Sequence, residues 1–501
     1  MLKIDNLTII TSKGRKLVED FSFVLNDEDK VALIGEEGNG KSTLLKIIAG
    51  VDTESYVSYS GKIITDGRIG YLPQSIETKY LDLSVEEYIA EQIDYAFLYE
   101  ILNRISLDYS LFDDRSVGTL SGGERVKVSL VKMLYNDPDI LLMDEPSNDL
   151  DLKTLIWLEE FIKNCDKPMI FVSHDETLLS SCANGILHLE QLKRKSEPHL
   201  SYAGLSYDEY LKSRNAFIDR NNMIAAKQKA QLDKQLEKWR RIYQKVEHRQ
   251  NSISRGDPHG GKLLKKKMHS VKAQGRIIEE KKKNLTEKYE PEEAIDVFFE
   301  KVDINPNKVI LDLKLDELKI QDRVLAKDIS LHVQGKDKIC IIGDNGTGKS
   351  TLIRIIKEKL FKREDIKAGY MPQNYYEVLD YSLYPLDLLW DKRSIEQRAR
   401  IQSFLGALRF TSEEMQHPIA GLSDGQRCKI LLIKLILDKC DVLILDEPSR
   451  NLSPLSGPII RKILNEFNGC IISVSHDRRY INEVANKVYE LDVQGLHLLD
   501  R

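Results

Sequence analysis

The sequence predicts two α/β domains that repeat one another and are joined by a long antiparallel helical hairpin. Three observations predict this architecture. A glycine-rich loop between an apolar strand and a helix occurs at residues 35–43 and again at residues 343–351. Further short motifs follow each loop in the same order. Between the two copies, residues 212–288 are highly charged, and their apolar residues recur at coiled-coil spacing.

Each glycine-rich loop is predicted to bind the phosphates of a nucleotide. Both loops have the pattern G-x-x-G-x-G-K-S-T. Its glycines let backbone N–H groups surround phosphates, its lysine reaches the β and γ phosphates, and its serine hydroxyl can bind Mg²⁺. The candidate residues are Gly35, Gly38, Gly40, Lys41, Ser42 and Thr43 in the first copy and Gly343, Gly346, Gly348, Lys349, Ser350 and Thr351 in the second.

The motifs after each loop complete the repeat. A tyrosine-x-proline-glutamine run ends at Gln74 and again at Gln373. A second glycine-rich turn, here called the signature, occupies residues 120–124 and 422–426. An Asp-Glu pair and then a Ser-His-Asp run follow in each copy, and the signature serine, the acidic pair and the histidine all repeat at an offset of 302 residues. A repeat of this order is an architecture, not a coincidence.

The acidic pairs end apolar strands and are candidates for metal binding and catalysis. The aspartate of each pair is predicted to hold Mg²⁺, directly or through water, and the glutamate to polarise the attacking water, because phosphoryl transfer needs a positioned base. The histidine is placed to contact the γ-phosphate. The candidate metal ligands are Ser42, Gln74, Asp144, Ser350, Gln373 and Asp446. The candidate catalytic residues are Glu145, His174, Glu447 and His476.

Length and composition narrow the class of protein. A chain of 501 residues is long enough for two or three domains. It has no run of about 18 apolar residues, so no membrane span is predicted. Its six cysteines are scattered without a CxxC pair, which argues against a disulfide framework, a zinc ribbon or an iron–sulfur cluster. We therefore expect a cytoplasmic protein.

The charge of the chain is unevenly distributed. Residues 212–250 and residues 262–288 each have a net charge of +7, whereas the whole chain has a net charge of −5. The rest of the chain is therefore at about −19. Such separation favours a basic element that acts on a polyanion. A solvated coiled-coil spacer is the alternative, although a spacer would more often mix the two signs.

The basic segment is predicted to form two helices. Apolar positions are spaced alternately four and three residues apart, which is typical of packed helical seams. These positions are Leu232, Leu236, Trp239, Tyr243 and Val246, then Leu264, Met268, Val271, Gly275 and Ile278. Residues 251–262 between them are rich in helix breakers and are the predicted tip. A first helix from about Asn215 to Gln250 would be roughly 50 Å long. The candidate contact residues are Arg255, His259, Lys262, Lys265, Lys266 and Lys267.

The ordered motifs resemble those of the ABC ATPases. In that family two cassettes dimerise head to tail, and the signature of one closes over nucleotide held by the other. The resemblance implies ATP and Mg²⁺ as cofactors and hydrolysis of ATP to ADP and phosphate. It also implies that the cassette dimer is intramolecular and the protein a monomer. Site one, built on the first glycine-rich loop, is then completed by Ser423 and Gly425, and site two by Ser121, Gly122 and Gly123.

Two cassettes without a membrane span, with a basic hairpin between them, resemble the ABC-F family. The run at residues 201–211 is also similar to that family's segment after the first cassette. The resemblance divides the chain into a first ABC domain (1–195), a linker (196–302) and a second ABC domain (303–501). It implies binding to the E site of the 70S ribosome in the ATP state. The hairpin would then reach the P-site tRNA and the 23S rRNA of the peptidyl-transferase centre.

Departures from the family pattern favour one branch of it. The first cassette lacks the arm that housekeeping members insert between glutamine and signature. The second signature has Asp424 in place of glycine, and Ser453 stands where the closing aspartate of the D-loop is expected, which predicts slow turnover at site one. The second half resembles members that protect ribosomes from lincosamides, pleuromutilins and streptogramins A. A housekeeping translation factor, the ATPase subunit of a transporter and a DNA-associated ABC ATPase are the alternatives.

Overall fold

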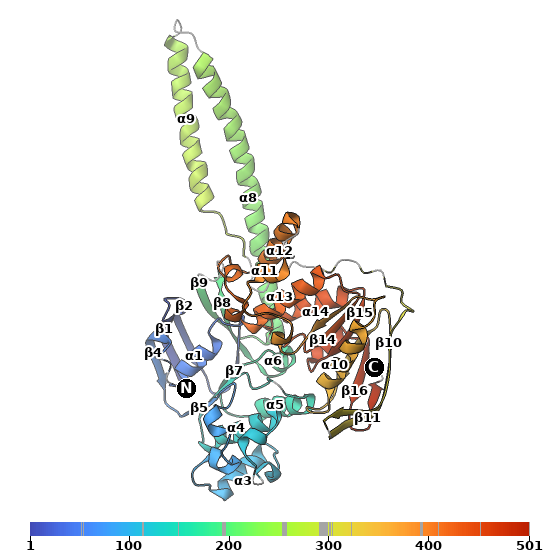
Figure 1. The fold of residues 1–501 in the computed structure, drawn as a ribbon. Helices are drawn as coiled ribbons and strands as arrows, with labels where there is room; N and C mark the ends of the chain where they lie inside the picture. Colours follow the sequence, from blue (N-terminus) through green and yellow to red (C-terminus); the bar gives the residue numbers. More distant parts are fainter. Residues whose placement is uncertain are drawn as a thin grey trace. The chain divides into compact units, whose positions relative to one another are not determined.

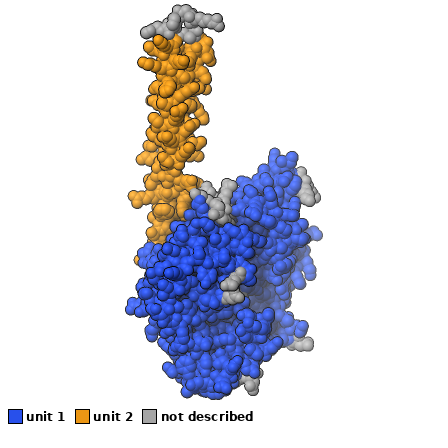
Figure 2. All heavy atoms as spheres, turned by 90° about the vertical axis from the view of Figure 1, so that its left-hand side faces the viewer, with its two compact units in different colours: residues 1–207, 292–501 blue, residues 208–291 orange. Residues whose placement is uncertain are grey.

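The computed structural model describes most of the chain in two compact units (Figure 2). The first unit comprises residues 1–207 and 292–501, and the second comprises residues 208–291. The described residues are 1–51, 53, 55–112, 115–148, 150–192, 197–252, 258–289, 299, 302, 304–321, 323–390, 394–408, 410–450 and 452–499. The first unit therefore contains both of the repeated α/β domains.

The first cassette is built on a six-stranded sheet in which all strands but the last are parallel (Figure 1). In sheet order these strands are β5 (Ile69–Leu72), β6 (Ile140–Asp144), β7 (Met169–Val172), β3 (Lys30–Ile34), β8 (Gly185–Gln191) and the antiparallel β9 (Glu197–Ala203). A second, antiparallel sheet contains β2 (Lys16–Leu25), β1 (Leu2–Thr11) and β4 (Val57–Thr65). Every residue of β6 and β7 is buried, as expected when both faces of a parallel sheet are covered.

The second cassette repeats this plan (Figure 1). Its six-stranded sheet runs β13 (Ala368–Met371), β14 (Val442–Asp446), β15 (Cys470–Val474), β12 (Lys338–Ile342), β16 (Lys487–Leu491) and the antiparallel β17 (Leu496–Leu499). Its antiparallel sheet has the two strands β10 (Val309–Ile320) and β11 (Arg323–Gln334) among the described residues. The predicted fold class, two ABC-type α/β domains with a helical hairpin between them, is confirmed.

Helices cover the sheets of both cassettes. In the first cassette they are α1 (Lys41–Ile48), α2 (Val85–Ile89), α3 (Tyr95–Arg104), α4 (Gly122–Tyr135), α5 (Leu152–Asn164) and α6 (Glu176–Cys182). In the second they are α10 (Lys349–Phe361), α11 (Pro385–Leu389), α12 (Ile395–Ala407), α13 (Asp424–Leu437), α14 (Gly457–Glu466) and α15 (Arg478–Glu483). Short 3₁₀ helices occur at Thr78–Tyr80, Tyr109–Phe112, Val117–Thr119, Tyr375–Glu377, Glu414–Gln416 and Ile419–Gly421.

The second unit is a hairpin of two helices. Helix α8 (Tyr207–Ser252) has 46 residues and is therefore about 69 Å long, and α9 (Pro258–Lys283) follows it. The helix begins eight residues before the predicted Asn215, because no breaker separates the two positions and Asp208 and Glu209 are favourable in a first helical turn. Proline is well suited to the first position of α9.

The predicted seams are the ones that the hairpin buries. Val246, Met268 and Val271 form its apolar core, and the Trp239 Nε1–H donates to the carbonyl of Val271 at 2.8 Å. Helix α9 continues through Gly275, where a Cβ atom would lie 2.9 Å from the Trp239 ring. The glycine therefore allows the indole to approach the helix backbone closely.

The predicted tip is described only in part. Arg255 lies outside the described residues, and of His259 only the backbone, in the first turn of α9, is described. Lys262, Lys265, Lys266 and Lys267 are exposed along the following turns of α9. These four lysines thus present a basic surface that the structure does describe.

Candidate active site

Both glycine-rich loops, hereafter P-loops, fold as strand, loop and helix. Strand β3 leads into the first loop and α1 begins at Lys41, while β12 leads into the second and α10 begins at Lys349. The residues that cap these helices, Gly40 and Gly348, have φ values of 104° and 98°. This left-handed conformation favours glycine, and it leaves the N–H groups of the first helical turn free to bind an anion.

The P-loop lysines are held over their own loops. Lys41 Nζ donates to the carbonyls of Gly35 at 2.9 Å and Glu36 at 3.2 Å. Lys349 Nζ donates to the carbonyls of Gly343 and Asp344, both at 2.8 Å. Burial lowers the pKa of Lys349. Both ammonium groups lie where a polyphosphate would complete their coordination.

A buried aspartate lies beside the P-loop serine in each cassette. Ser42 Oγ donates to Asp144 Oδ1 at 3.0 Å, and Ser350 hydrogen-bonds to Asp446. Burial raises the pKa of both aspartates. Asp446 Oδ1 is buried with no hydrogen-bond partner among the described residues. In the second cassette this hydroxyl and a carboxylate with an unused oxygen fit a hard cation such as Mg²⁺, which would also lower the pKa of Asp446 when bound. In the first, Asp144 Oδ2 accepts from the Tyr71 hydroxyl at 3.3 Å.

The two candidate catalytic glutamates have a strained backbone. Glu145 has a φ of 52° and Glu447 a φ of 54°, a left-handed conformation that costs energy for any residue with a Cβ atom. Each follows directly after its sheet strand, and its N–H donates to the last residue of the neighbouring strand, Val172 or Val474. The repeated strain directs both carboxylates toward the P-loop side of the sheet edge.

The surroundings of Glu145 favour its charged form. Its carboxylate accepts hydrogen bonds from Gln74 Nε2 at 2.9 Å and from Asn148, and His174 Nε2 lies 3.0 Å away. Burial alone would raise the pKa of Glu145, but the hydrogen bond and charge of His174, with Lys41 and Asn148, lower it to about 2. Gln74 thus contacts the proposed base in the described structure.

The surroundings of Glu447 favour its neutral form. Burial, together with the neighbouring charge of Asp446, raises the pKa of Glu447 to about 8. The nearest imidazole nitrogen, His476 Nε2, is 3.7 Å away, and burial and Lys349 lower the pKa of His476 to about 4. The pKa values of the equivalent glutamates in the two cassettes are therefore shifted in opposite directions.

Each site contains residues of both cassettes. At site one, the N–H of Gly425 in the second signature donates to Glu37 of the first P-loop at 2.6 Å. At site two, a cavity of about 900 Å³ is lined from the second cassette by Lys349, Ser350, Gln373, Asp446 and Glu447 and from the first by Gly122 and Asn148. This is the head-to-tail arrangement that the family resemblance implies.

The structure also places several other predicted residues. Gly346, Gly348, Thr351, His174 and His476 also line the cavity of site two. The signature serines cap their own helices, because Ser121 Oγ accepts from the N–H of Glu124 and Ser423 Oγ from the N–H of Gln426. The side chains of Glu124 and Gln426 in turn accept from the backbone N–H groups of these serines, which completes a capping box at the start of each helix.

The structure brings further residues to site one that motif analysis did not select. Glu36, Glu37 and Lys429 lie between the first P-loop and the second signature, and the carbonyl of Leu452 lies 2.6 Å from His174 Nδ1. A signal for the glutamates was present in the sequence, because the second P-loop has Asp344 and Asn345 at these positions.

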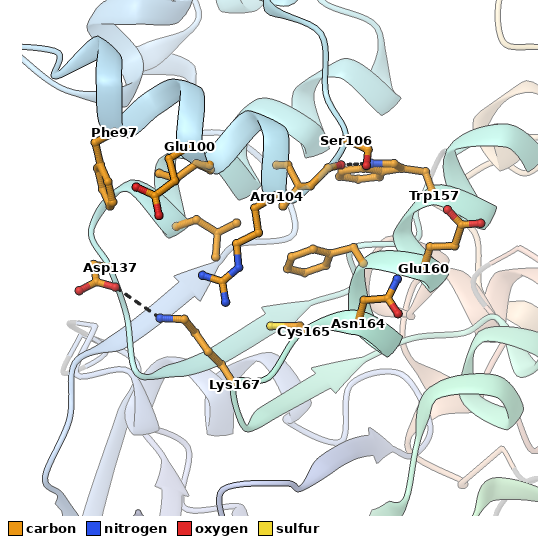
Figure 3. A pocket seen from close by; sticks show the side chains of 14 residues that line it. Phe97, Glu100, Arg104, Ser106, Asp137, Trp157, Glu160, Asn164, Cys165 and Lys167 are labelled. Atoms are coloured by element: carbon orange, nitrogen blue, oxygen red, sulfur yellow. Dashed lines mark hydrogen bonds and ion pairs between the residues drawn. The ribbon is translucent and has the colours of Figure 1, made fainter.

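A smaller cavity of about 190 Å³ lies in the first cassette among α3, α4 and α5 (Figure 3). Its lining includes Trp157, whose Nε1–H donates to the carbonyl of Ile105 at 2.8 Å. Lys167 on its wall is 3.4 Å from Asp137. None of its lining residues belongs to a P-loop, a signature or an acidic pair. We therefore assign it no part in nucleotide binding.

Comparisons with known proteins agree with this geometry. Residues 18–148 and 326–450 match the family described as ABC transporter. The ATP-binding protein Uup of Buchnera aphidicola is 30% identical over 99% of this chain and 81% of its own length. ABC transporter F family member 5 of Arabidopsis thaliana is 26% identical over 98% of this chain and 75% of its own length.

Solved structures show the same fold. An archaeal ribosome recycling factor, aABCE1, in complex with the ribosomal stalk protein aP1 matches with a TM-score of 0.59 and 17% identity, over 95% of this chain and 86% of that one. Among the residues that the structure describes, no helix is both long and apolar enough to cross a membrane.

Proposed function

We propose that this chain binds the E site of the 70S ribosome in its ATP-closed state. The chain belongs to the ABC family and, within that family, to the ABC-F ATPases. Its enzymatic activity is the hydrolysis of ATP. The proposal adds a partner and a role in translation. The hairpin reaches toward the P-site tRNA and the 23S rRNA at the peptidyl-transferase centre. There it protects the ribosome from lincosamide, pleuromutilin and streptogramin A antibiotics.

The observation that carries the proposal is the charge of the hairpin. Residues 212–250 and 262–288 contribute +7 each, on two helices whose apolar side chains face one another. The described lysines at 262, 265, 266 and 267 are all exposed. Lysines that neutralise phosphates release counterions, so such a surface binds RNA with an affinity that falls steeply with salt.

ATP supplies the switch in this proposal. Each site takes residues from both cassettes, so nucleotide bound at a P-loop also contacts the opposite signature and favours the closed arrangement. A ligand shifts a conformational equilibrium only by its differential affinity for the two states. If the closed state is the one that fits the ribosome, ATP and the ribosome must each increase the affinity for the other.

The antibiotic-protection part of the proposal depends on the family branch. It is supported by the missing arm in the first cassette and by Asp424 and Ser453 in the second. The other candidate, a translation factor without a drug, shares the ATPase and ribosome-binding steps. The two differ only in whether a drug at the peptidyl-transferase centre loses its effect.

The test is translation in vitro inhibited by lincomycin, a pleuromutilin or a phenicol, with and without the protein and ATP. Rescue limited to these drugs, with no rescue from a drug of the small subunit, is the expected result. ATP-dependent binding to 70S ribosomes without rescue would favour the translation factor. Absence of ribosome binding in ATP would overturn the proposal.

A further inference from the structure

The two P-loops differ at the positions that face the opposite cassette. The first has Glu36 and Glu37 where the second has Asp344 and Asn345. Both glutamates of the first loop contact the second cassette directly. Site one is therefore joined across the cassettes by the protein's own carboxylates.

Glu36 forms a nearly enclosed set of polar contacts. Its carboxylate accepts hydrogen bonds from the hydroxyls of Ser453 and Ser456, the latter at 2.6 Å, and lies 3.2 Å from Lys429 Nζ. The side chains of Glu36 and Lys429 are only 15% and 6% exposed. Burial opposes ionisation, but Lys429 and the two hydroxyls lower the pKa of Glu36 to about 2. The carboxylate is thus a buried, fully paired anion.

Glu37 binds the second signature itself. Its Oε2 accepts from the N–H of Gly425 at 2.6 Å, in the first turn of α13. The N-terminus of a helix is favourable for an anion, because its first N–H groups lack helical partners. At site one, a carboxylate of the protein therefore lies at the glycine that the family resemblance assigns to nucleotide.

Site two differs from site one in which loop supplies the buried contact, because the carboxylate there comes from the D-loop. There the D-loop aspartate, Asp151, accepts from the backbone N–H of Asn345 in the P-loop. At the equivalent position of the second cassette, 302 residues later, stands Ser453, which donates to Glu36. An aspartate at 453 would face the Glu36 carboxylate, and two neighbouring carboxylates destabilise one another's charged forms. The serine in the second D-loop is therefore the complement of the glutamate in the first P-loop.

The histidines of the two sites also differ in their contacts with the opposite D-loop. His174 Nδ1 is 2.6 Å from the carbonyl of Leu452 in the opposite D-loop. His476 Nδ1 is buried without a hydrogen-bond partner in the described part of the chain. Together with the cavity of about 900 Å³ at site two, these contacts distinguish a closed site one from an open site two.

We propose that Glu36 and Glu37 form a latch that holds site one closed before nucleotide binds, so that site two is the site that opens and closes in each cycle. The latch explains why the second D-loop has Ser453 where the family pattern has aspartate, without loss of the interface. The proposal rests on the ATPase fold and does not depend on ribosome binding or drug protection.

A cluster of ion pairs supports a fixed contact between the cassettes. Arg461 donates to Glu176 at 2.6 Å, with both side chains less than 5% exposed. Arg479 contacts the same glutamate at 3.1 Å, and Arg478 contacts Glu159 at 2.8 Å. The arginines of these pairs come from the second cassette and the glutamates from the first. Removal of one partner from the buried Arg461–Glu176 pair would leave an uncompensated charge in the interface, so these side chains fit only while the two cassettes are in contact.

The test is amide hydrogen exchange of the full chain without nucleotide or ribosome. In the parent protein, peptides covering residues 33–42 and 421–432 should exchange about tenfold or more slowly than the equivalent peptides 341–350 and 119–130, since hydrogen bonds to charged groups contribute at least that factor. The double variant Glu36→Gln/Glu37→Gln should remove this difference. It keeps the side-chain shape and removes the charge.

Asp344→Asn is the matched control, because Asp344 occupies the position of Glu36 but is exposed, and its pair across the cassettes, Lys153 at 2.7 Å, is exposed too. Circular dichroism and the exchange of the site-two peptides check that the variants fold. Equal exchange of the two signatures in the parent would refute a closed site one. Protection that survives the double variant would refute the glutamates as its cause.

Turnover gives a second readout. In the parent, Glu447→Gln should remove most ATP hydrolysis, whereas Glu145→Gln should reduce it by less than about half, because only site two cycles freely. Release of the latch should raise the turnover that remains in Glu447→Gln several-fold. Equal loss in the two single glutamine variants would contradict the asymmetric cycle.

Discussion

Replacement of Glu447 by glutamine should stabilise the second cassette at alkaline pH in the absence of nucleotide. The burial of this carboxyl and the neighbouring Asp446 raise its pKa from 4.5 to about 8. The folded protein therefore binds a proton that the unfolded chain releases at lower pH. Stability from this group is fully present below the unfolded pKa and is lost as the pH rises toward the folded pKa. Glutamine resembles the protonated form and does not titrate.

The size of the effect follows from the shift in pKa. Each pKa unit corresponds to about 1.4 kcal/mol, so the parent should lose about 3 to 4 kcal/mol of unfolding free energy between about pH 5 and pH 8. The variant should not lose this part. For a domain of this size, that difference corresponds to an unfolding temperature roughly 10 °C higher for the variant at the upper pH.

Calorimetry of parent and variant across this pH range is the assay. The matched control is Glu145→Gln, because His174 and Lys41 outweigh burial and hold the pKa of Glu145 at about 2. The charge of Glu145 contributes stability above about pH 4.5 that is lost only as the pH falls toward 2, so its replacement should destabilise by a similar amount at pH 5 and pH 8. An advantage of Glu447→Gln that does not grow with pH would refute the reasoning.

Three further predictions concern the ribosome and the hairpin. The double variant Glu145→Gln/Glu447→Gln should bind ATP without hydrolysis and remain on 70S ribosomes, as measured by sedimentation. If the variant bound ribosomes in ATP no more tightly than the parent does, the ATP switch would be contradicted. Lys265→Glu/Lys266→Glu/Lys267→Glu should weaken ribosome binding and reduce the salt slope by about three, whereas Lys16→Glu/Lys79→Glu on the first cassette should not. Gly275→Leu should destabilise the hairpin by about 1 to 3 kcal/mol in urea unfolding, because even a Cβ atom there would lie 2.9 Å from Trp239. The control is Gly406→Ala, which has no atom within 4 Å of the added Cβ and should be neutral or slightly stabilising.

Features that depend on local sequence were predictable. The P-loops combine a strand end, a turn and a helix start, the acidic pairs end strands, and the signatures begin helices. Glycines, capping serines and apolar runs therefore identify them without tertiary information. The hairpin seams were predictable because side chains four and three residues apart lie on one helix face. The start of α8 at Tyr207 was missed, because the predicted range began where the dense charge pattern begins rather than at the last helix breaker.

Contacts across the cassettes could not be obtained in this way. Lys429 lies 393 residues from Glu36 in the chain, and Leu452 lies 278 residues from His174. Each motif predicts the backbone conformation of its own residues. It does not predict which polar group of the other cassette lies opposite them. The sequence did suggest that Asp424 and Ser453 make site one unlike site two. The physical reason for this difference comes from the structure, which places Glu36 against Ser453.

The charge of each catalytic glutamate is connected to the closure of its site. At site one, the carbonyl of Leu452 lies on one nitrogen of His174, and the other nitrogen lies 3.0 Å from Glu145. The contact with the Leu452 carbonyl holds the His174 ring beside Glu145, and the hydrogen bond and charge of His174 lower the pKa of that glutamate against the effect of burial. At site two, His476 has no such partner on Nδ1 among the described residues and lies 3.7 Å from Glu447. By the repeat, Leu150 is the residue equivalent to Leu452, so closure of site two should place its carbonyl on His476. The same movement that brings the signature over the P-loop would then lower the pKa of Glu447, so that this base is more fully ionised in the closed site than in the open one.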